Sequence, residues 1–236
     1  MYLSVPDATH LAEKIRRALP QPKSKVVVCP SFPALLPVGA VLKKSRYDLG
    51  AQDLSIEIKG SQTGQVCPKD LKDLGCKYVI VGHSERRAIG ESDLQIKKKF
   101  TNALAHKLIP ILCVGETLEE KKSGQAKSIV RNQLTVVLKN LQATSYKLKA
   151  IHVAYEPVWA IGTGCAANPE DACEMHAFIK ETVTKLVGHD IIIRILYGGS
   201  VTAENAQNYL KEKGVDGLLV GGASTKLTFV DILKTA

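Results

Sequence analysis

The sequence has few aromatic residues, no long apolar run and no paired-cysteine motif. Phe, Trp and Tyr make up 5% of its 236 residues, and no apolar run approaches the ~18 residues of a membrane-spanning helix. Few aromatic rings are available for bases to stack on, and the lysines are dispersed along the chain. We therefore expect no nucleic-acid partner and no membrane association, although the formal net charge is +9.

Cysteine usage and the N-terminus both indicate a reducing compartment. The six cysteines show no C-x-x-C spacing, which argues against a disulfide scaffold and against a zinc site. The opening residues, Met1-Tyr2-Leu3-Ser4, lack the basic start and apolar segment of a secretory signal. The expected location is the cytoplasm, with no metal.

The composition is that of a folded globular chain. Apolar residues make up 45% and charged residues 23%, close to ordinary globular usage. Single α/β barrels contain about 250 residues. Residues 1–236 are therefore expected to form one domain.

Short β-branched runs alternate with amphipathic stretches along the whole chain. The runs are nearly all apolar, which is typical of strands buried on both faces. The expected strands are Lys25–Cys29, Asp48–Gln52, Tyr78–Gly82, Ile109–Val114, Ala150–Glu156, Ile191–Tyr197 and Gly217–Val220. The expected helices are Asp7–Leu19, Asp93–His106, Ala126–Leu141, Asn168–Leu186, Thr202–Lys211 and Ser224–Leu233.

This alternation predicts a parallel sheet with helical crossovers. A (β/α)₈ TIM barrel needs eight strands, each followed by a helix. Here seven strands follow one opening helix, which has no strand in front of it. The pattern is compatible with such a barrel that lacks its first strand, and periodicity alone would also allow an open doubly wound sheet.

Most of the chemically unusual residues follow directly after strands. His83 comes after the Tyr78–Gly82 strand, and Glu156 ends another strand before an apolar, glycine-rich stretch. In an α/β barrel all strand C-terminal ends lie on one face, where active sites are built. A carboxylate there suits a general base, and the stretch after it suits a lid that excludes water. The alternative interpretation of Glu156 is a salt-bridged residue before an ordinary loop.

Two glycine-bearing turns follow the last two strands and are expected to open helices. They are Gly198-Gly199-Ser200 and Gly221-Gly222. Backbone N–H groups at helix starts bind phosphate, because they lack helical partners and the helix dipole favours an anion. The alternative is that these turns merely need glycine for a positive φ.

Several segments together resemble the triosephosphate isomerase family. They are Val81-Gly82-His83-Ser84-Glu85-Arg86-Arg87, Cys113-Val114-Gly115-Glu116, Ala154-Tyr155-Glu156-Pro157-Val158-Trp159-Ala160-Ile161-Gly162-Thr163-Gly164, Tyr197-Gly198-Gly199-Ser200-Val201 and Leu219-Val220-Gly221-Gly222-Ala223. The resemblance spans the chain in order. It implies a TIM barrel, a homodimer, and interconversion of dihydroxyacetone phosphate and glyceraldehyde 3-phosphate without a cofactor.

The resemblance also implies a role for each matching residue. Glu156 is expected to be the base that moves a proton between C1 and C2, and His83 the electrophile that polarises the carbonyl. Donors to the substrate phosphate are expected from Gly162, Ser200, Gly221 and Gly222. Tyr197 is expected to help hold the closed lid.

The sequence departs from the family pattern in three places, one of which is the far hinge of the lid, where Cys165 replaces the usual Lys. The family begins with a strand ending in Asn-x-Lys, whose lysine lies beside the substrate, and no such motif occurs in residues 1–236. We therefore expect a barrel open by one strand that is poorly soluble or loosely folded and nearly inactive, with a catalytically impaired or silent phosphosugar-binding barrel as the alternative. The loop around Thr63 resembles the family's dimer loop, but Gln62 and Gln65 replace its usual aromatic and Glu.

Overall fold

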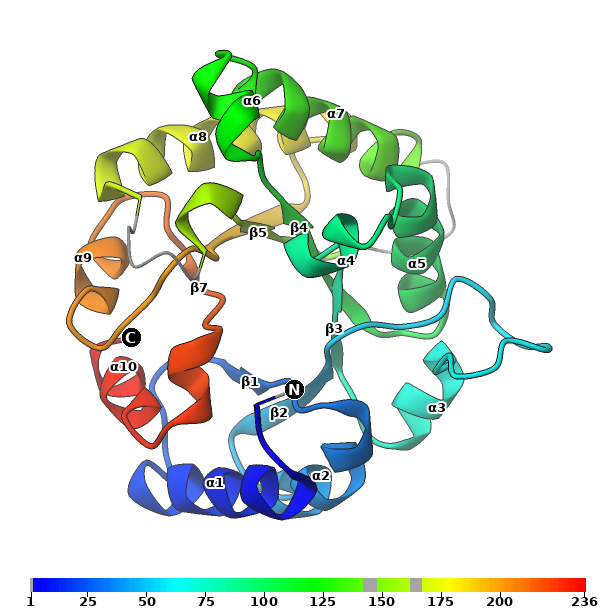
Figure 1. Cartoon of the computed structure of the whole chain (residues 1–236), viewed down its shortest axis with the longest axis vertical. Helices are drawn as coiled ribbons and strands as arrows, with labels where there is room; N and C mark the ends of the chain where they lie inside the picture. Colours follow the sequence, from blue (N-terminus) through cyan, green and yellow to red (C-terminus); the bar gives the residue numbers. More distant parts are fainter. Residues whose placement is uncertain (1, 142–147, 162–166) are drawn as a thin grey trace.

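Seven parallel strands form one curled sheet in the part of the chain that the structure describes (Figure 1). The structure is a computed structural model, and it describes residues 2–141, 148–161 and 167–236. The strands are β1 (Val26–Val28), β2 (Tyr47–Ala51), β3 (Tyr78–Val81), β4 (Ile109–Val114), β5 (Ala150–Tyr155), β6 (Ile192–Tyr197) and β7 (Gly217–Leu218).

The order of the strands in the sheet is their order in the sequence, from β1 to β7. A doubly wound sheet would reverse its strand order near the middle, so the TIM-barrel prediction is confirmed and the doubly wound alternative is wrong. The expected strands match the observed ones to within one or two residues at each end. Among the residues described, no ladder hydrogen bonds join β1 to β7, and the sheet is open there, as expected.

Helices lie outside the curled sheet (Figure 1). The α-helices are α1 (Val5–Ala18), α2 (Leu35–Leu42), α3 (Pro68–Asp73), α4 (Ser84–Ala88), α5 (Asp93–Ala105), α6 (Leu118–Lys122), α7 (Ala126–Leu138), α8 (Pro169–Val187), α9 (Ala206–Leu210) and α10 (Phe229–Thr235). Short 3₁₀ turns are η1 (Phe32–Ala34), η3 (Val158–Ala160) and η4 (Gly222–Thr225). None of the described helices is long and apolar enough to cross a membrane.

Local sequence explains where the long helices begin and end. Ser92 caps α5 in a capping box with Gln95, which satisfies two backbone donors that lack helical partners. Asn168 accepts from the backbone N–H of Glu170 at 3.3 Å, and Pro169 opens α8, as expected from the sequence.

Two predicted helix starts are wrong. The helix expected from Ser224 begins only at Phe229, as α10, because residues 222–225 form the 3₁₀ turn η4. The sequence placed a helix from Thr202, but α9 begins at Ala206. The Thr202 backbone N–H donates to Asn205 Oδ1 at 2.8 Å, and the Asn205 backbone N–H donates to Thr202 Oγ1 at 3.4 Å. These side chains stabilise a turn in place of the first helical turn, because short polar side chains compete for backbone groups.

Alternate residues of the strands face two different cores. Val79 and Val81 of β3 are fully buried against the helices. Tyr78 and Ile80, which alternate with these two valines along the strand, pack in an inner cluster with Cys113 of β4. This alternation is the two-residue period of a strand. It packs the strands on both sides and sets the direction in which residues at their C-terminal ends project.

Candidate active site

The imidazole of His83 lies at the N-terminus of α4. Gly82, with φ of +74°, turns the chain out of β3 and makes His83 the N-cap residue. His83 Nδ1 accepts a hydrogen bond from the Glu85 backbone N–H at 3.2 Å. Because Nδ1 accepts, the hydrogen of a neutral ring must be on Nε2, an assignment made from the hydrogen-bond partners.

Glu156 meets that nitrogen directly. His83 Nε2 lies 2.9 Å from Glu156 Oε1, and the Ser84 backbone N–H donates to Oε2 at 2.8 Å. Glu156 follows the last residue of β5 and is 2% exposed. The carboxylate therefore receives an imidazole N–H and a donor at a helix N-terminus, both of which favour negative charge. His83 and Glu156, identified separately from sequence, form one site.

Opposing effects determine the pKa of His83. Burial lowers its pKa, but the hydrogen bond and charge of Glu156, together with the charge of Glu85, outweigh burial and raise the net pKa above the ordinary value. The backbone N–H on Nδ1 acts against protonation at that nitrogen. The hydrogen bond to Glu156 and the charge of that carboxylate are therefore the main reasons why the pKa of this imidazole lies above its ordinary value.

Replacing the Glu156 carboxylate by an amide should lower the pKa of His83. In Glu156→Gln the charge is lost while the side chain keeps its length, so the effect of burial prevails. An NMR pH titration of the ring protons measures the shift. The matched control is Glu85→Gln, which should lower the pKa less because Glu85 is largely exposed. An equal or larger effect of Glu85→Gln would contradict the assignment.

Two glycines allow the chain to pack closely around Glu156. A Cβ at Gly115, just after β4, would overlap the Glu156 carbonyl oxygen, and one at Gly198, just after β6, would lie 3.0 Å from Glu156 Cγ. The amide of Gln133 holds both backbone groups of Gly115, at 2.9 and 3.0 Å. The neighbouring strand ends therefore confine the carboxylate from two sides.

Gly115→Ala should destabilise the fold by about 3 kcal/mol, the upper part of the range for overpacking a tight core, and should also reduce activity. The added methyl meets backbone, which cannot rotate away. Urea denaturation and turnover measure the two effects. The matched control is Gly39→Ala, whose Cβ would meet the flexible end of Leu49 at 3.0 Å. Similar losses in both variants would rule out a specific effect at Glu156.

The segment that follows Glu156 is anchored on its near side by Glu116. Glu116 Oε1 accepts from the Trp159 indole N–H at 2.8 Å and from the Tyr155 hydroxyl at 3.0 Å. Glu116 lies within the Cys113-Val114-Gly115-Glu116 motif, but the sequence indicates no role for it. No spacing rule connects it to Trp159, which is 43 residues away. The structure adds Glu116 and Trp159 to the site's surroundings.

On its far side the segment is anchored by two tyrosines. The Ala167 backbone N–H donates to Tyr197 Oη at 3.2 Å, and the Tyr209 hydroxyl donates to the Ala167 carbonyl at 2.5 Å. The two rings stack with centroids 4.0 Å apart. Tyr197 thus contacts Ala167, and its expected role in holding a closed lid stays a prediction. Tyr209 is an addition from the structure.

The predicted phosphate donors are placed in part. Gly162 lies outside the described residues, as does Cys165 at the far hinge of the lid. The Ser200 hydroxyl donates to the Ala160 carbonyl at 2.6 Å, which joins the β6 loop to η3. Gly221 is the N-cap of η4, and Gly222 is its first residue. The prediction that both turns open helices is correct only for the second, because α9 begins six residues after Ser200, at Ala206.

Positive φ does not explain these glycines. None of Gly198, Gly199, Gly221 and Gly222 has a positive φ. A Cβ on Gly199 would overlap the Tyr197 ring, whereas none of the described atoms lies within 4 Å of a Cβ built on Gly221 or Gly222. Close packing therefore explains Gly198 and Gly199, whereas Gly221 and Gly222 leave open space beside their backbone N–H groups.

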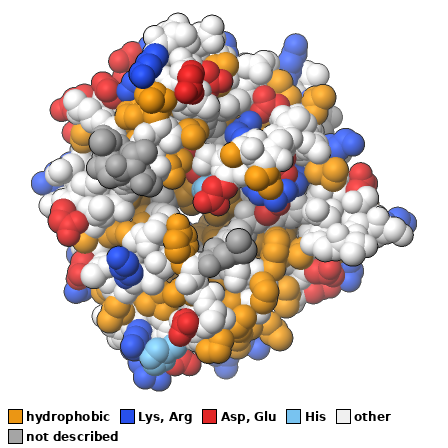
Figure 2. Space-filling model, in the orientation of Figure 1, with side chains coloured by type: hydrophobic (Ala, Val, Ile, Leu, Met, Phe, Trp, Pro, Cys, Tyr) orange, Lys and Arg blue, Asp and Glu red, His pale blue; other side chains and the backbone are white. Residues whose placement is uncertain are grey.

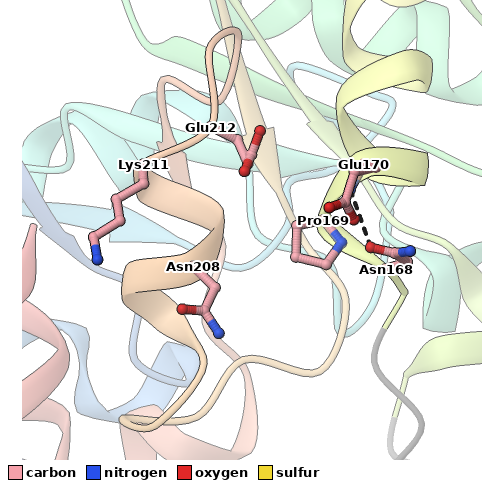
Figure 3. A pocket seen from close by; sticks show the side chains of 6 residues that line it. All are labelled: Asn168, Pro169, Glu170, Asn208, Lys211 and Glu212. Carbon is pink, nitrogen blue, oxygen red and sulfur yellow. Dashed lines mark hydrogen bonds between the residues drawn. The ribbon is translucent and has the colours of Figure 1, made fainter.

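The helix α4, which His83 caps, lies toward the middle of the view in Figure 1. The same face in Figure 2 has a hollow near its middle with hydrophobic and acidic side chains around it. A separate surface hollow of about 350 Å³ lies between the start of α8 and α9 (Figure 3). Asn168, Glu170, Lys211 and Glu212 are among its lining residues. None of the predicted site residues lines it. In the described ranges no group of three His, Cys, Asp or Glu residues could hold a metal ion.

Comparison with known proteins gives one consistent result. The sequence model of the family described as "Triosephosphate isomerase" matches residues 1–236. A protein of that name from Roseiflexus sp. (strain RS-1) is 48% identical over 230 residues, which cover 96% of this chain and 90% of the relative. A protein of the same name from Carboxydothermus hydrogenoformans is 50% identical over 214 residues, which cover 89% of this chain and 84% of the relative. One from Zygosaccharomyces bailii is 43% identical over 228 residues, which cover 95% of this chain and 90% of the relative. The chain therefore belongs to the triosephosphate isomerase family.

Proposed function

We propose that this chain interconverts dihydroxyacetone phosphate and glyceraldehyde 3-phosphate by proton transfer, as a step of glycolysis and gluconeogenesis. The observation that carries the proposal is the contact between His83 Nε2 and the buried Glu156 carboxylate, 2.9 Å apart at the C-terminal ends of two strands. An aldose–ketose isomerisation needs one base that can reach two adjacent carbons, and one donor to the carbonyl oxygen. This pair supplies both.

Glu156 takes the proton from C1 of the ketone and returns it to C2. In the proposed reaction, removal of that proton leaves an enediolate, and His83 Nε2–H donates to the oxygen on which its charge develops. Preorganised donors of this kind stabilise charge most effectively in a water-excluded site. His83 then moves a proton between the two oxygens, and no net oxidation or proton uptake occurs.

The contact between the two residues also tunes the histidine. In the unliganded site the carboxylate raises the pKa of His83. When the substrate carbonyl replaces Glu156 as the acceptor, that effect weakens and burial favours the neutral ring. A neutral imidazole at a helix N-terminus is this family's general pattern. We propose that substrate binding leaves His83 as a neutral donor.

Backbone N–H groups at the end of the barrel bind the substrate phosphate in this proposal. The open space at Gly221 and Gly222 supports it, as does the position of Gly221 at the start of η4. Ser200 and Gly162 complete the proposed set. No cofactor and no metal take part. The net charge of +9 attracts the anionic substrate, most strongly at low salt.

Inorganic phosphate should bind at this site. Titration followed by amide NMR should shift the signals of Ser200, Gly221 and Gly222, because a bound anion polarises the N–H groups that hold it. Lys97 and Lys98 on α5 are the built-in control for unspecific attraction to lysine, whereas the next lysine, Lys99, is buried in ion pairs with Asp53 and Glu91. Shifts confined to Lys97 and Lys98 would contradict the proposed site.

The proposed partners are the phosphotriose and a second copy of the chain. The loop around Thr63 extends away from the barrel (Figure 1), and residues 57–65 are all exposed. The base of the loop is closed by the hydrogen bond from the Ser55 backbone N–H to the Val66 carbonyl, at 2.8 Å. We propose that the tip docks on the partner copy. A light-scattering mass equal to one chain would contradict this. The proposed location is the cytoplasm, where free cysteines persist.

The deciding experiment is a coupled assay of isomerisation in both directions on the purified 236-residue chain. Turnover that disappears in His83→Ala and Glu156→Gln supports the proposal. Phosphotriose binding without turnover in the parent chain would support the silent-barrel alternative. The retained base and electrophile argue against that alternative, because a binding protein has no need of a carboxylate held against an imidazole.

A further inference from the structure

Arg87 in α4 uses all three nitrogens of its guanidinium on different parts of the barrel. Nε donates to the Gly82 carbonyl at 2.8 Å, Nη2 to the Cys113 carbonyl at 3.0 Å, and Nη1 to Asp93 Oδ1 at 2.6 Å. The side chain is only 18% exposed. It therefore connects the end of β3, the end of β4 and the start of α5.

Both backbone contacts of Arg87 are next to the reacting pair. Gly82 immediately precedes His83. Cys113 precedes Val114, whose carbonyl accepts from the Glu156 backbone N–H at 2.8 Å. One planar group thus touches the strand end that carries the imidazole and the strand end on which the carboxylate rests.

We propose that Arg87 is a positioning residue for the isomerase reaction, setting the separation and orientation of His83 and Glu156. A guanidinium is planar, permanently charged and able to donate in several fixed directions at once. Its hydrogen bonds to the two carbonyls resist relative movement of the strand ends. Asp93 holds the third nitrogen and keeps the plane in place. This inference rests on the proposed function.

The neighbouring Arg86 provides a matched comparison. Its guanidinium lies among acidic side chains, 3.2 Å from Asp53 and 3.5 Å from Glu91. No hydrogen bond from Arg86 to a strand-end carbonyl is found in the described part of the chain. The two arginines share a helix and a charge but differ in what they hold.

The test compares Arg87→Lys with Arg86→Lys. A lysine keeps the charge but cannot reach both carbonyls and Asp93 together. In Arg87→Lys we expect kcat to fall about 100-fold, the loss typical of a 1 Å misplacement, with KM changing much less. We also expect a shifted or broadened NMR signal of the His83 Nε2–H. In Arg86→Lys both readouts should stay near those of the parent chain.

Three results would overturn the inference: equal kcat in the two variants, an Arg87→Lys kcat equal to that of the parent, or an unchanged His83 signal in Arg87→Lys. If Arg87→Lys does not fold, Asp93→Asn replaces it, because it removes the anchor and leaves both carbonyl contacts possible. That variant should lose about tenfold in kcat with the same spectroscopic change, and no loss would overturn the inference. If the parent chain does not turn over, the proposed function fails, and the His83 signal alone still tests Arg87.

Discussion

Shortening Glu156 by one methylene should lower kcat about 100-fold while the fold stays intact. In Glu156→Asp the carboxylate is withdrawn from His83 Nε2, now 2.9 Å away, and from the substrate carbons beyond it. Proton transfer needs close positioning, and a 1 Å displacement costs about 100-fold in rate. Glu156→Gln, which removes the base, should cost about 10²–10⁴-fold. Steady-state kinetics measure both, with circular dichroism to verify folding.

The matched control is Glu174→Asp, the same substitution at an exposed position on α8. Glu174 pairs with Lys127 at 2.6 Å on the surface, where an ion pair contributes about 0–1 kcal/mol. Its kcat should equal that of the parent. An undiminished kcat in Glu156→Asp would exclude Glu156 as the base.

Adding a strand that ends in Asn-x-Lys before residue 1 should raise kcat about 10²–10³-fold, by analogy with the loss of one preorganised donor. The sheet is open between β1 and β7 in the residues described, and each end presents unpaired backbone groups. One added strand at a spacing of ~4.8 Å fills the gap. By the family pattern, we expect its lysine to supply a fixed positive charge beside the substrate phosphate. Turnover measures the rise in kcat, and the midpoint of urea unfolding measures the stability gained when the added strand pairs with β1 and β7.

A second extended variant separates the effect of closing the sheet from the effect of the added Asn and Lys side chains. The same strand with Ala in place of the Asn and the Lys should raise the unfolding midpoint as much as the first, because the backbone makes the ladder. It should leave kcat near that of the 236-residue chain. The expected contribution of the added strand to catalysis would be wrong if the 236-residue chain were as active as the extended one. It would also be wrong if the alanine strand restored turnover by itself.

The strands and long helices were predictable because their patterns are local. Ile109–Val114 is a buried apolar run, and its observed ends are the predicted ones. The short helix α2 was not predicted, because Leu35–Leu42 is apolar on every side and contains Pro37 and Gly39. Packing of Leu35 and Val38 into the core decides that segment. Burial in the tertiary structure, and not an amphipathic pattern in the sequence, therefore makes this segment helical.

The reacting pair was predictable for a different reason. His83 and Glu156 each follow a strand of a parallel sheet, and parallel strands end on one face, so two distant positions had to share that face. The direct contact of 2.9 Å was not predictable. It depends on Gly115 and Gly198 allowing the chain to pack closely around Glu156. That packing exists only once β4, β5 and β6 lie side by side.

By itself the sequence determined the βα order, the family, and the two residues proposed to carry the proton chemistry, because these are properties of local pattern and chain direction. The tertiary structure alone decided that Arg87 joins two strand ends and that Glu116 holds Trp159. It also showed that one tyrosine stacks on another beside Ala167. A hydrogen bond between residues tens of positions apart depends on distances of a few tenths of an ångström, and those distances are set by the packing of the whole barrel.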